Sequence, residues 1–110
     1  MAPRKPRKER LVCISLRPDG SLQAEPDSVK VRRGNVVRWV TIVRDARIEI
    51  SFKKRHGSPF GDKRLSEPSR GHVLSPPVRE DAEYGKYPYT VVLTMGKCEV
   101  TLDPDVDVQR

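Results

Sequence analysis

The chain has 110 residues, the size of one ordinary domain, and this length is too short for two independent hydrophobic cores. Apolar residues make up 35% of the chain and charged residues 34%, so the core must be thin. Ten prolines and seven glycines favour turns and short strands over long helices. No run approaches the roughly 18 consecutive apolar residues of a membrane span, and the start lacks the apolar stretch of a secretory signal. We therefore expect a cytoplasmic protein without a transmembrane segment.

The net charge of +7 is concentrated in the first half of the chain. Residues 1–55 hold fifteen lysines and arginines against six acidic residues, whereas residues 56–110 hold seven against nine. Residues 1–9 are densely basic, contain two prolines and carry almost no apolar side chain. Such a segment cannot bury enough surface to offset its chain entropy, so we expect a disordered basic arm there.

Four strands are predicted after this arm. Residues 10–16 form an apolar run of strand length that ends in a Pro-Asp-Gly turn. Residues 28–32 alternate valine with polar side chains, which is typical of a half-buried strand. Residues 36–43 follow an Arg-Gly-Asn turn and are mostly β-branched or aromatic, with Trp39 among them. Residues 47–52 again alternate apolar and polar side chains, which predicts the fourth strand.

A long irregular segment occupies about residues 53–72. It is rich in Gly, Ser, Pro and charge, and Phe60 and Leu65 are its only large apolar residues. Long irregular segments of compact domains often carry function, so this loop is a candidate binding region. Val73 and Leu74 then predict a short edge strand, which two prolines close.

Three further strands complete the pattern, at residues 87–93, 98–102 and 106–108. Seven to eight strands and no helix predict an all-β fold, a single small antiparallel or mixed β-sandwich over residues 10–110. An immunoglobulin-like sandwich is the structural alternative, although the Cys-Trp-Cys pattern of antibody domains is absent.

The two cysteines, Cys13 and Cys98, lie in predicted strands far apart in the sequence. In a reducing compartment such residues act as small buried hydrophobes, and this is our expectation for both. A disulfide between them is the alternative, because sequence does not fix the geometry of a pair.

The order of the strands also carries a resemblance to a known family. Residues 29–39 read VKVRRGNVVRW, and residues 87–91 read YPYTV. These segments resemble two regions of the cupredoxin, or plastocyanin-like, family. In that family a V-x-V-x-x-G-D-x-V-x-W segment leads to the first copper histidine, and a Tyr-x-Phe-x-Cys strand leads to the remaining ligands. The resemblance covers roughly residues 10–108 and implies a cupredoxin-like β-sandwich.

The copper ligands of that family do not carry over to this sequence. A blue-copper site needs two imidazoles and a thiolate, with a weak axial ligand. Val91 stands where the family has its thiolate, and Thr94 stands near the place of the following histidine. No histidine occurs between Trp39 and Phe52, where the first ligand would lie. The resemblance therefore implies a copper-free relative, and we expect no metal and no cofactor.

Two other clusters have both a structural and a functional interpretation. Tyr84, Tyr87 and Tyr89 either pack within the sheet or form a stacking platform for bases, and alternation puts the last two on one face. The carboxylates of residues 103–107 form either a polar turn or a calcium site, although the glycine and terminal glutamate of an EF-hand loop are missing.

The basic residues are the strongest candidates for a binding site. A basic arm can neutralise phosphates without folding, and a second basic run opens the long irregular segment. We predict that an acidic partner is contacted by Arg4, Lys5, Arg7, Lys8, Arg10, Arg32, Arg33, Lys53, Lys54 and Arg55. Ordinary solubilising surface charge is the alternative interpretation of these residues.

These observations favour binding over catalysis. No nucleophile elbow or similar signature joins a serine to a histidine, so we expect no enzyme. Our leading hypothesis is a non-enzymatic adaptor domain that contacts an acidic partner, DNA or RNA, without sequence specificity, since no sequence-reading motif is present. One alternative is a structural subunit that pairs its edge strands with other protein subunits. Another is a non-standard copper or metal protein that uses Met95, Cys98 and a histidine.

Overall fold

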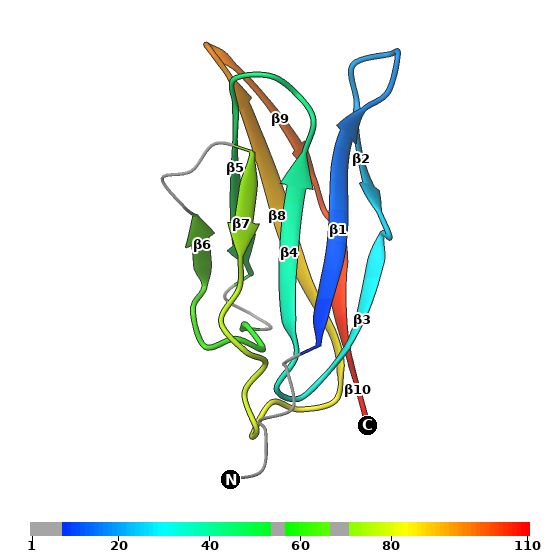
Figure 1. Cartoon of the computed structure of the whole chain (residues 1–110), viewed down its shortest axis with the longest axis vertical. Coiled ribbons are helices and arrows are strands. Elements are labelled where there is room, and N and C mark those ends of the chain that lie inside the picture. Colours follow the sequence, from blue (N-terminus) through cyan, green and yellow to red (C-terminus); the bar gives the residue numbers. More distant parts are fainter. Residues whose placement is uncertain (1–7, 54–56, 67–70) are drawn as a thin grey trace, which may run out of the picture.

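The computed structural model describes residues 8–53, 57–66 and 71–110, and this part of the chain forms ten β-strands without a helix. The strands make two sheets that pack face to face (Figure 1). Within the described ranges, accordingly, no helix is long and apolar enough to cross a membrane. The all-β sandwich predicted from the sequence is confirmed.

The first sheet has the strand order β2-β1-β4-β7. Its strands are β1 (Glu9–Leu16), β2 (Leu22–Glu25), β4 (Val36–Thr41) and β7 (His72–Leu74). β1 pairs with β4 in parallel, and the other pairs are antiparallel. The short strand β7 lies at the sheet edge, as predicted for residues followed by two prolines.

The second sheet has the order β3-β10-β8-β5-β6, and β9 also pairs with β8. Its strands are β3 (Ser28–Arg32), β5 (Ala46–Phe52), β6 (Arg64–Ser66), β8 (Gly85–Met95), β9 (Cys98–Leu102) and β10 (Asp105–Gln109). β3 pairs with β10 in parallel. The long strand β8 pairs with β10 along its first half and with β9 along its second half.

An aromatic cluster fills the centre between the sheets. The Trp39 and Tyr89 side chains are fully buried, and the indole Nε1 of Trp39 donates a hydrogen bond of 3.0 Å to the Tyr89 hydroxyl. Phe52 and Phe60 pack edge-on or tilted against these rings, with centroids 5.6 to 6.2 Å apart. Such pairs add to the stabilisation that burial of apolar surface supplies.

The chain changes sheets between β2 and β3, and this leaves an opening along one side of the sandwich. β2 pairs only with residues 13–16 of β1. Residues 9–12 of β1 therefore have β4 as their strand partner on one side, and their other edge faces β3 (Figure 1). β3 is itself the edge strand of the second sheet. The opening lies at the end of the sandwich where β1 begins and β10 ends, which we call the lower end, as in Figure 1.

The structure contains two strands that the sequence pattern did not predict, β2 and β6. Both are short, and β6 lies inside the segment 53–72 that was expected to be a loop. This segment is held to the core by Phe60 and Leu65, which are both buried. The described residues therefore form ten strands rather than the seven to eight expected.

The expectation of buried cysteines was wrong. Both Cys13 and Cys98 are exposed, and both are free thiols. Cys13 alternates along β1 with Val12 and Ile14, which point into the core, so its own side chain points outward. Burial of every residue in an apolar run requires covering layers on both faces, and here Leu11 and Cys13 on the outer face of β1 are exposed.

Candidate anion-binding groove

A basic groove occupies the opening between β1 and β3 at the lower end. The hollow has a volume of about 260 Å³. It is lined by Lys8, Arg10, Lys30, Val31, Arg32, Asn35 and Gln109. Four of these side chains are cationic and none is acidic, so the hollow attracts anions.

Strands and one tight turn position every lining residue except Lys8, which directly precedes β1. Arg10 continues the inward-facing row of Val12 and Ile14 beyond the end of the apolar core, and it is half-buried there. Lys30 and Arg32 lie on β3, where Arg32 is opposite Gln109 of β10. This arrangement brings cations from the first strand, the third strand and the chain segment before β1 to one place.

The turn after β3 fixes the far side of the groove. The Asn35 side-chain oxygen accepts a hydrogen bond of 2.9 Å from the Arg32 amide, and the Asn35 amide donates to the Arg32 carbonyl at 3.0 Å. Gly34 between them has φ of 87°, a left-handed conformation that glycine adopts without strain. The turn therefore depends on the Arg-Gly-Asn sequence that precedes β4.

The four cations have no acidic partner among the described residues. None of Lys8, Arg10, Lys30 and Arg32 forms an ion pair with a described carboxylate. Asp107 stands opposite Lys30 in the β3–β10 pairing, and Glu9 lies between Lys8 and Arg10 in the sequence. The Nε of Arg10 is buried from solvent and has no hydrogen-bond partner in the part of the chain that the structure describes, which is uncommon for a buried polar atom.

A second hollow of about 600 Å³ continues the groove along β1 and β3. It shares Arg10, Lys30 and Gln109 with the first hollow and adds Glu9, Leu11, Pro26, Ser28 and Val29. The Glu9 carboxylate forms an ion pair with Arg38 of β4. The combined groove is thus an extended channel, and Arg10 and Lys30 lie where its two parts meet.

The structure brings together three of the predicted binding residues, Lys8, Arg10 and Arg32. Arg33 is engaged elsewhere: its Nε and Nη2 donate hydrogen bonds of 3.1 and 2.8 Å to the Ala82 carbonyl. Its guanidinium also lies 4.3 Å from the centroid of the Tyr84 ring. These contacts hold the segment before β8 against the β3–β4 turn, so Arg33 has a structural role.

Lys53, the last of the predicted residues that the structure describes, does not extend the groove. Lys53 is absent from its lining, and the Lys53 Nζ lies 4.0 Å from an oxygen of Asp103. Five of the predicted residues lie outside the described residues, namely Arg4, Lys5, Arg7, Lys54 and Arg55.

Lys30 is the basic groove residue that the sequence analysis did not predict. It alternates with Val29 and Val31 and is two residues from Arg32, so both cations extend from the same face of β3. That alternation was a usable signal. Asn35 and Gln109 carried no comparable signal, because their position in the groove depends on long-range strand pairing.

The tyrosines separate into core and surface residues. Tyr89 is fully buried, and burial raises the pKa of its hydroxyl. The half-buried Tyr87 donates a hydrogen bond of 2.7 Å from its hydroxyl to the Glu83 carbonyl. Tyr84 is 46% exposed, but Arg33 and Arg110 both lie near its ring, at 4.3 and 5.4 Å from the centroid. These contacts favour packing over a platform for bases.

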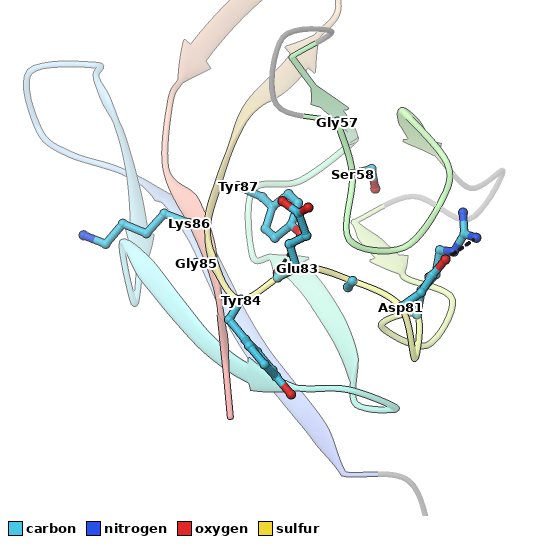
Figure 2. Close-up of a pocket in the computed structure, with 10 residues that line it drawn as sticks. Gly57, Ser58, Asp81, Glu83, Tyr84, Gly85, Lys86 and Tyr87 are labelled. Atoms are coloured by element: carbon cyan, nitrogen blue, oxygen red, sulfur yellow. Dashed lines mark hydrogen bonds and ion pairs between the residues drawn. The ribbon is translucent and has the colours of Figure 1, made fainter.

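A different hollow of about 390 Å³ lies near the start of β8 (Figure 2). The charged side chains that line this hollow do not point toward one common place. Asp81 is paired with Arg79 at 3.0 Å, and the Lys86 side chain extends away from the hollow in Figure 2. The Glu83 side chain lies beside the Tyr87 ring. Opposite charges that are paired or divergent give this hollow no preference for a charged ligand.

The described residues do not fit a metal centre. No three His, Cys, Asp or Glu side chains gather within the described ranges in a way that could hold an ion. Val91, at the place of the family's thiolate, is fully buried in the core. Two carboxylates of the segment 103–107 accept hydrogen bonds from side chains instead: Asp103 from Thr90 at 2.7 Å and Asp105 from Ser28 at 2.5 Å. His56 lies outside the described residues.

Comparison with known proteins finds similarity in structure only. No protein-family model matches the chain, and no curated protein matches it in sequence. Native pseudoazurin from Hyphomicrobium denitrificans matches with a TM-score of 0.53 and 19% identity, over 93% of this chain and 76% of that one. A Sinorhizobium pseudoazurin matches with a TM-score of 0.47 and 17% identity, over 93% and 75% of the two chains.

These matches concern the fold alone. The Hyphomicrobium structure supports the cupredoxin-like β-sandwich that the segments at 29–39 and 87–91 indicated. At 19% identity the likeness assigns no ligand and no partner to this chain. Function must therefore be argued from the groove.

Proposed function

We propose that this domain is a non-catalytic adaptor that binds an acidic macromolecule, nucleic acid, through the basic groove between β1 and β3. The observation that carries the proposal is the convergence of Lys8, Arg10, Lys30 and Arg32 on one hollow without an acidic lining residue. Phosphate groups of DNA or RNA are the most regular array of anions available to such a surface.

The position of the groove supports a role for the basic N-terminal segment. Lys8 belongs to the groove and directly follows a segment with three further cations, Arg4, Lys5 and Arg7. Contacts of this kind are made to the phosphate backbone, so binding is independent of sequence. Each neutralised phosphate releases counterions, which makes affinity fall as salt rises.

The test is binding of labelled duplex DNA, single-stranded RNA and an acidic peptide across a salt series. For duplex DNA the logarithm of the affinity should fall with the logarithm of the salt concentration with a slope of about −0.9 per contacted phosphate. The double variant Lys30→Gln/Arg32→Gln should make the slope shallower by about 2. The triple variant Arg4→Gln/Lys5→Gln/Arg7→Gln tests the segment before Lys8 in the same way.

The matched control is Arg17→Gln/Lys97→Gln, which removes the same charge from exposed turns at the opposite end of the sandwich. Net charge alone would make this control as weak a binder as the groove variant. Equal losses in the two double variants, or no binding to either nucleic acid, would overturn the proposal.

A protein-binding subunit is the second candidate, and the outer face of the first sheet favours it. Leu11 is 51% exposed and Leu74 is 37% exposed. Both stand in register with Arg38, so they share one row across β1, β4 and β7. Exposed apolar side chains on one face of a sheet are a feature of protein contacts when they form a continuous patch. Binding to the acidic peptide that is indifferent to salt and is lost in Leu11→Ser would favour this candidate.

A further inference from the structure

We propose that Arg10 and Lys30 form a discrete site for one phosphate group, at the point where the two parts of the groove meet. The inference rests on the proposed function for the kind of chain that carries the phosphate. It goes beyond general charge attraction, because it assigns one oxyanion to particular donor atoms.

The first argument is the unsatisfied donor on Arg10. A guanidinium has five N–H donors in a fixed planar arrangement, and its Nε is buried here with no partner. Folded proteins rarely leave such a donor unpaired, because its hydration is lost without replacement. A ligand oxygen that meets this N–H when the Arg10 side chain turns toward the groove would restore the missing hydrogen bond.

The second argument is the surrounding charge. Lys30 lines both hollows together with Arg10, and Lys8 and Arg32 line the first one. None of these side chains has an ion-pair partner among the described residues. Three cations without an ion-pair partner among the described residues, placed around the half-buried Arg10 guanidinium, favour an anion with several oxygens and more than one acceptor direction. A tetrahedral phosphate meets this requirement, and arginine binds it in a bidentate manner.

The third argument is the shape of the groove. The two hollows, of about 260 and 600 Å³, extend from the shared residues in two directions along β1 and β3. A phosphate at the junction can therefore carry a substituent on each side. This geometry points to a phosphodiester within an extended chain, and a free phosphate ion would occupy the junction alone.

The direct test is NMR of the arginine Nε–H groups in the full-length protein during titration with inorganic phosphate and, separately, with a dinucleotide that contains one phosphodiester. We expect the Arg10 Nε–H signal to shift saturably with both probes, and the dinucleotide to bind more tightly. A shift with inorganic phosphate alone would assign the site to free phosphate instead. An Arg10 signal that stays unchanged with both probes would overturn the site.

Three variants separate the named donors from charge in general. Arg10→Lys keeps the charge but removes Nε, and it should weaken phosphate binding roughly tenfold or more, as expected for loss of a hydrogen bond to a charged group. Lys30→Gln alters a side chain outside the core and should give a similar loss, which keeps the test valid if Arg10→Lys fails to fold. Arg17→Gln, after the far end of β1, should leave binding unchanged.

The outcomes distinguish this inference from the proposed function. Salt-sensitive binding to nucleic acid that Arg10→Lys leaves intact would remove the discrete site and keep the function. Saturable binding of the dinucleotide to the wild type, without affinity for longer DNA or RNA, would keep the site and remove the function. Equal loss in Lys30→Gln and Arg17→Gln would contradict the site, because each removes one positive charge and the result would show dependence on net charge alone.

Discussion

The aromatic centre and the basic groove differ in whether their buried polar atoms are hydrogen-bonded. In the centre, the Trp39 indole N–H meets the Tyr89 hydroxyl at 3.0 Å, and both residues are fully buried. In the groove, the buried Nε of Arg10 has no partner, and the cations around it have no acidic neighbour within ion-pair distance among the described residues. We therefore expect stability to depend mainly on the first region, and we propose that binding depends on the second.

The largest expected effect comes from emptying the aromatic centre. Trp39→Ala removes the largest fully buried side chain, which contacts both Phe60 and Tyr89. We expect a loss of about 3–5 kcal/mol in the free energy of unfolding, measured by urea denaturation. Tyr84→Ala, at a surface aromatic, should cost less than about 1 kcal/mol. A reversal of this order would show that the sandwich is stabilised elsewhere.

A smaller effect is expected when only the polar contact of the centre is broken. Tyr89→Phe keeps the ring but removes the oxygen that accepts from the Trp39 Nε1. The indole N–H is then buried without a partner, so unfolding should become easier by about 1–3 kcal/mol. Tyr87→Phe is the control, since its hydroxyl bonds a backbone carbonyl close to the surface. Equal changes in urea midpoint for the two variants would contradict this assignment.

The same hydroxyl makes stability depend on alkaline pH. Burial raises the pKa of Tyr89 above its ordinary value of about 10. The folded state therefore resists ionisation that the unfolded chain permits. The contribution is fully present below about pH 10 and is lost as pH rises through the pKa of the folded state. Urea midpoints at about pH 8 and pH 11 should differ less in Tyr89→Phe than in the wild type, whereas an identical difference would remove Tyr89 from the explanation.

The parts of the fold that sequence reasoning predicted are those with unambiguous alternation. Residues 28–32 and 47–52 alternate apolar with polar side chains, and both are strands in the structure. β2 and β6 were not predicted, because strands of four and three residues are too short to establish an alternating pattern of apolar and polar side chains. Cys13 was misjudged because the residues on either side of it, Val12 and Ile14, are both apolar, so only the neighbouring layers decide which side faces the core.

The sequence predicted some of the basic residues of the candidate groove, but it did not predict how they are arranged in space. Lys8, Arg10 and Arg32 were chosen for their charge, and parallel pairing of β1 with β4 and of β3 with β10 brings them to one end. Such pairings join segments far apart in sequence, and no local pattern specifies them. Charge alone does not distinguish Arg32 from Arg33. Arg32 lines the groove, whereas Arg33 donates hydrogen bonds to the Ala82 carbonyl.

Groove substitutions should barely change stability, which sharpens the contrast between the two regions. Lys30 and Arg32 make no side-chain ion pair with described residues and stand close to other cations. Lys30→Gln/Arg32→Gln should leave the free energy of unfolding within about 0.5 kcal/mol, with any gain confined to low salt because like-charge repulsion is relieved. A loss as large as that of Tyr89→Phe would mean that the groove belongs to the stabilising framework.

The smallest effect is expected at Cys13, on the outer face of β1. Its thiol is exposed and free, so it should react with a thiol reagent in the native protein as readily as in urea, and Cys13→Ser should leave the urea midpoint nearly unchanged.

Val12→Thr is the matched comparison, because it puts a hydroxyl on the adjacent residue, which is fully buried. Burial of that hydroxyl without a partner should cost about 1–3 kcal/mol. Suppose instead that Cys13→Ser lowers the free energy of unfolding by the ~1–3 kcal/mol expected for Val12→Thr. The outer face of the first sheet would then have to be covered in solution. That result would favour a protein partner bound near the exposed Leu11 and Leu74 over binding by the groove alone.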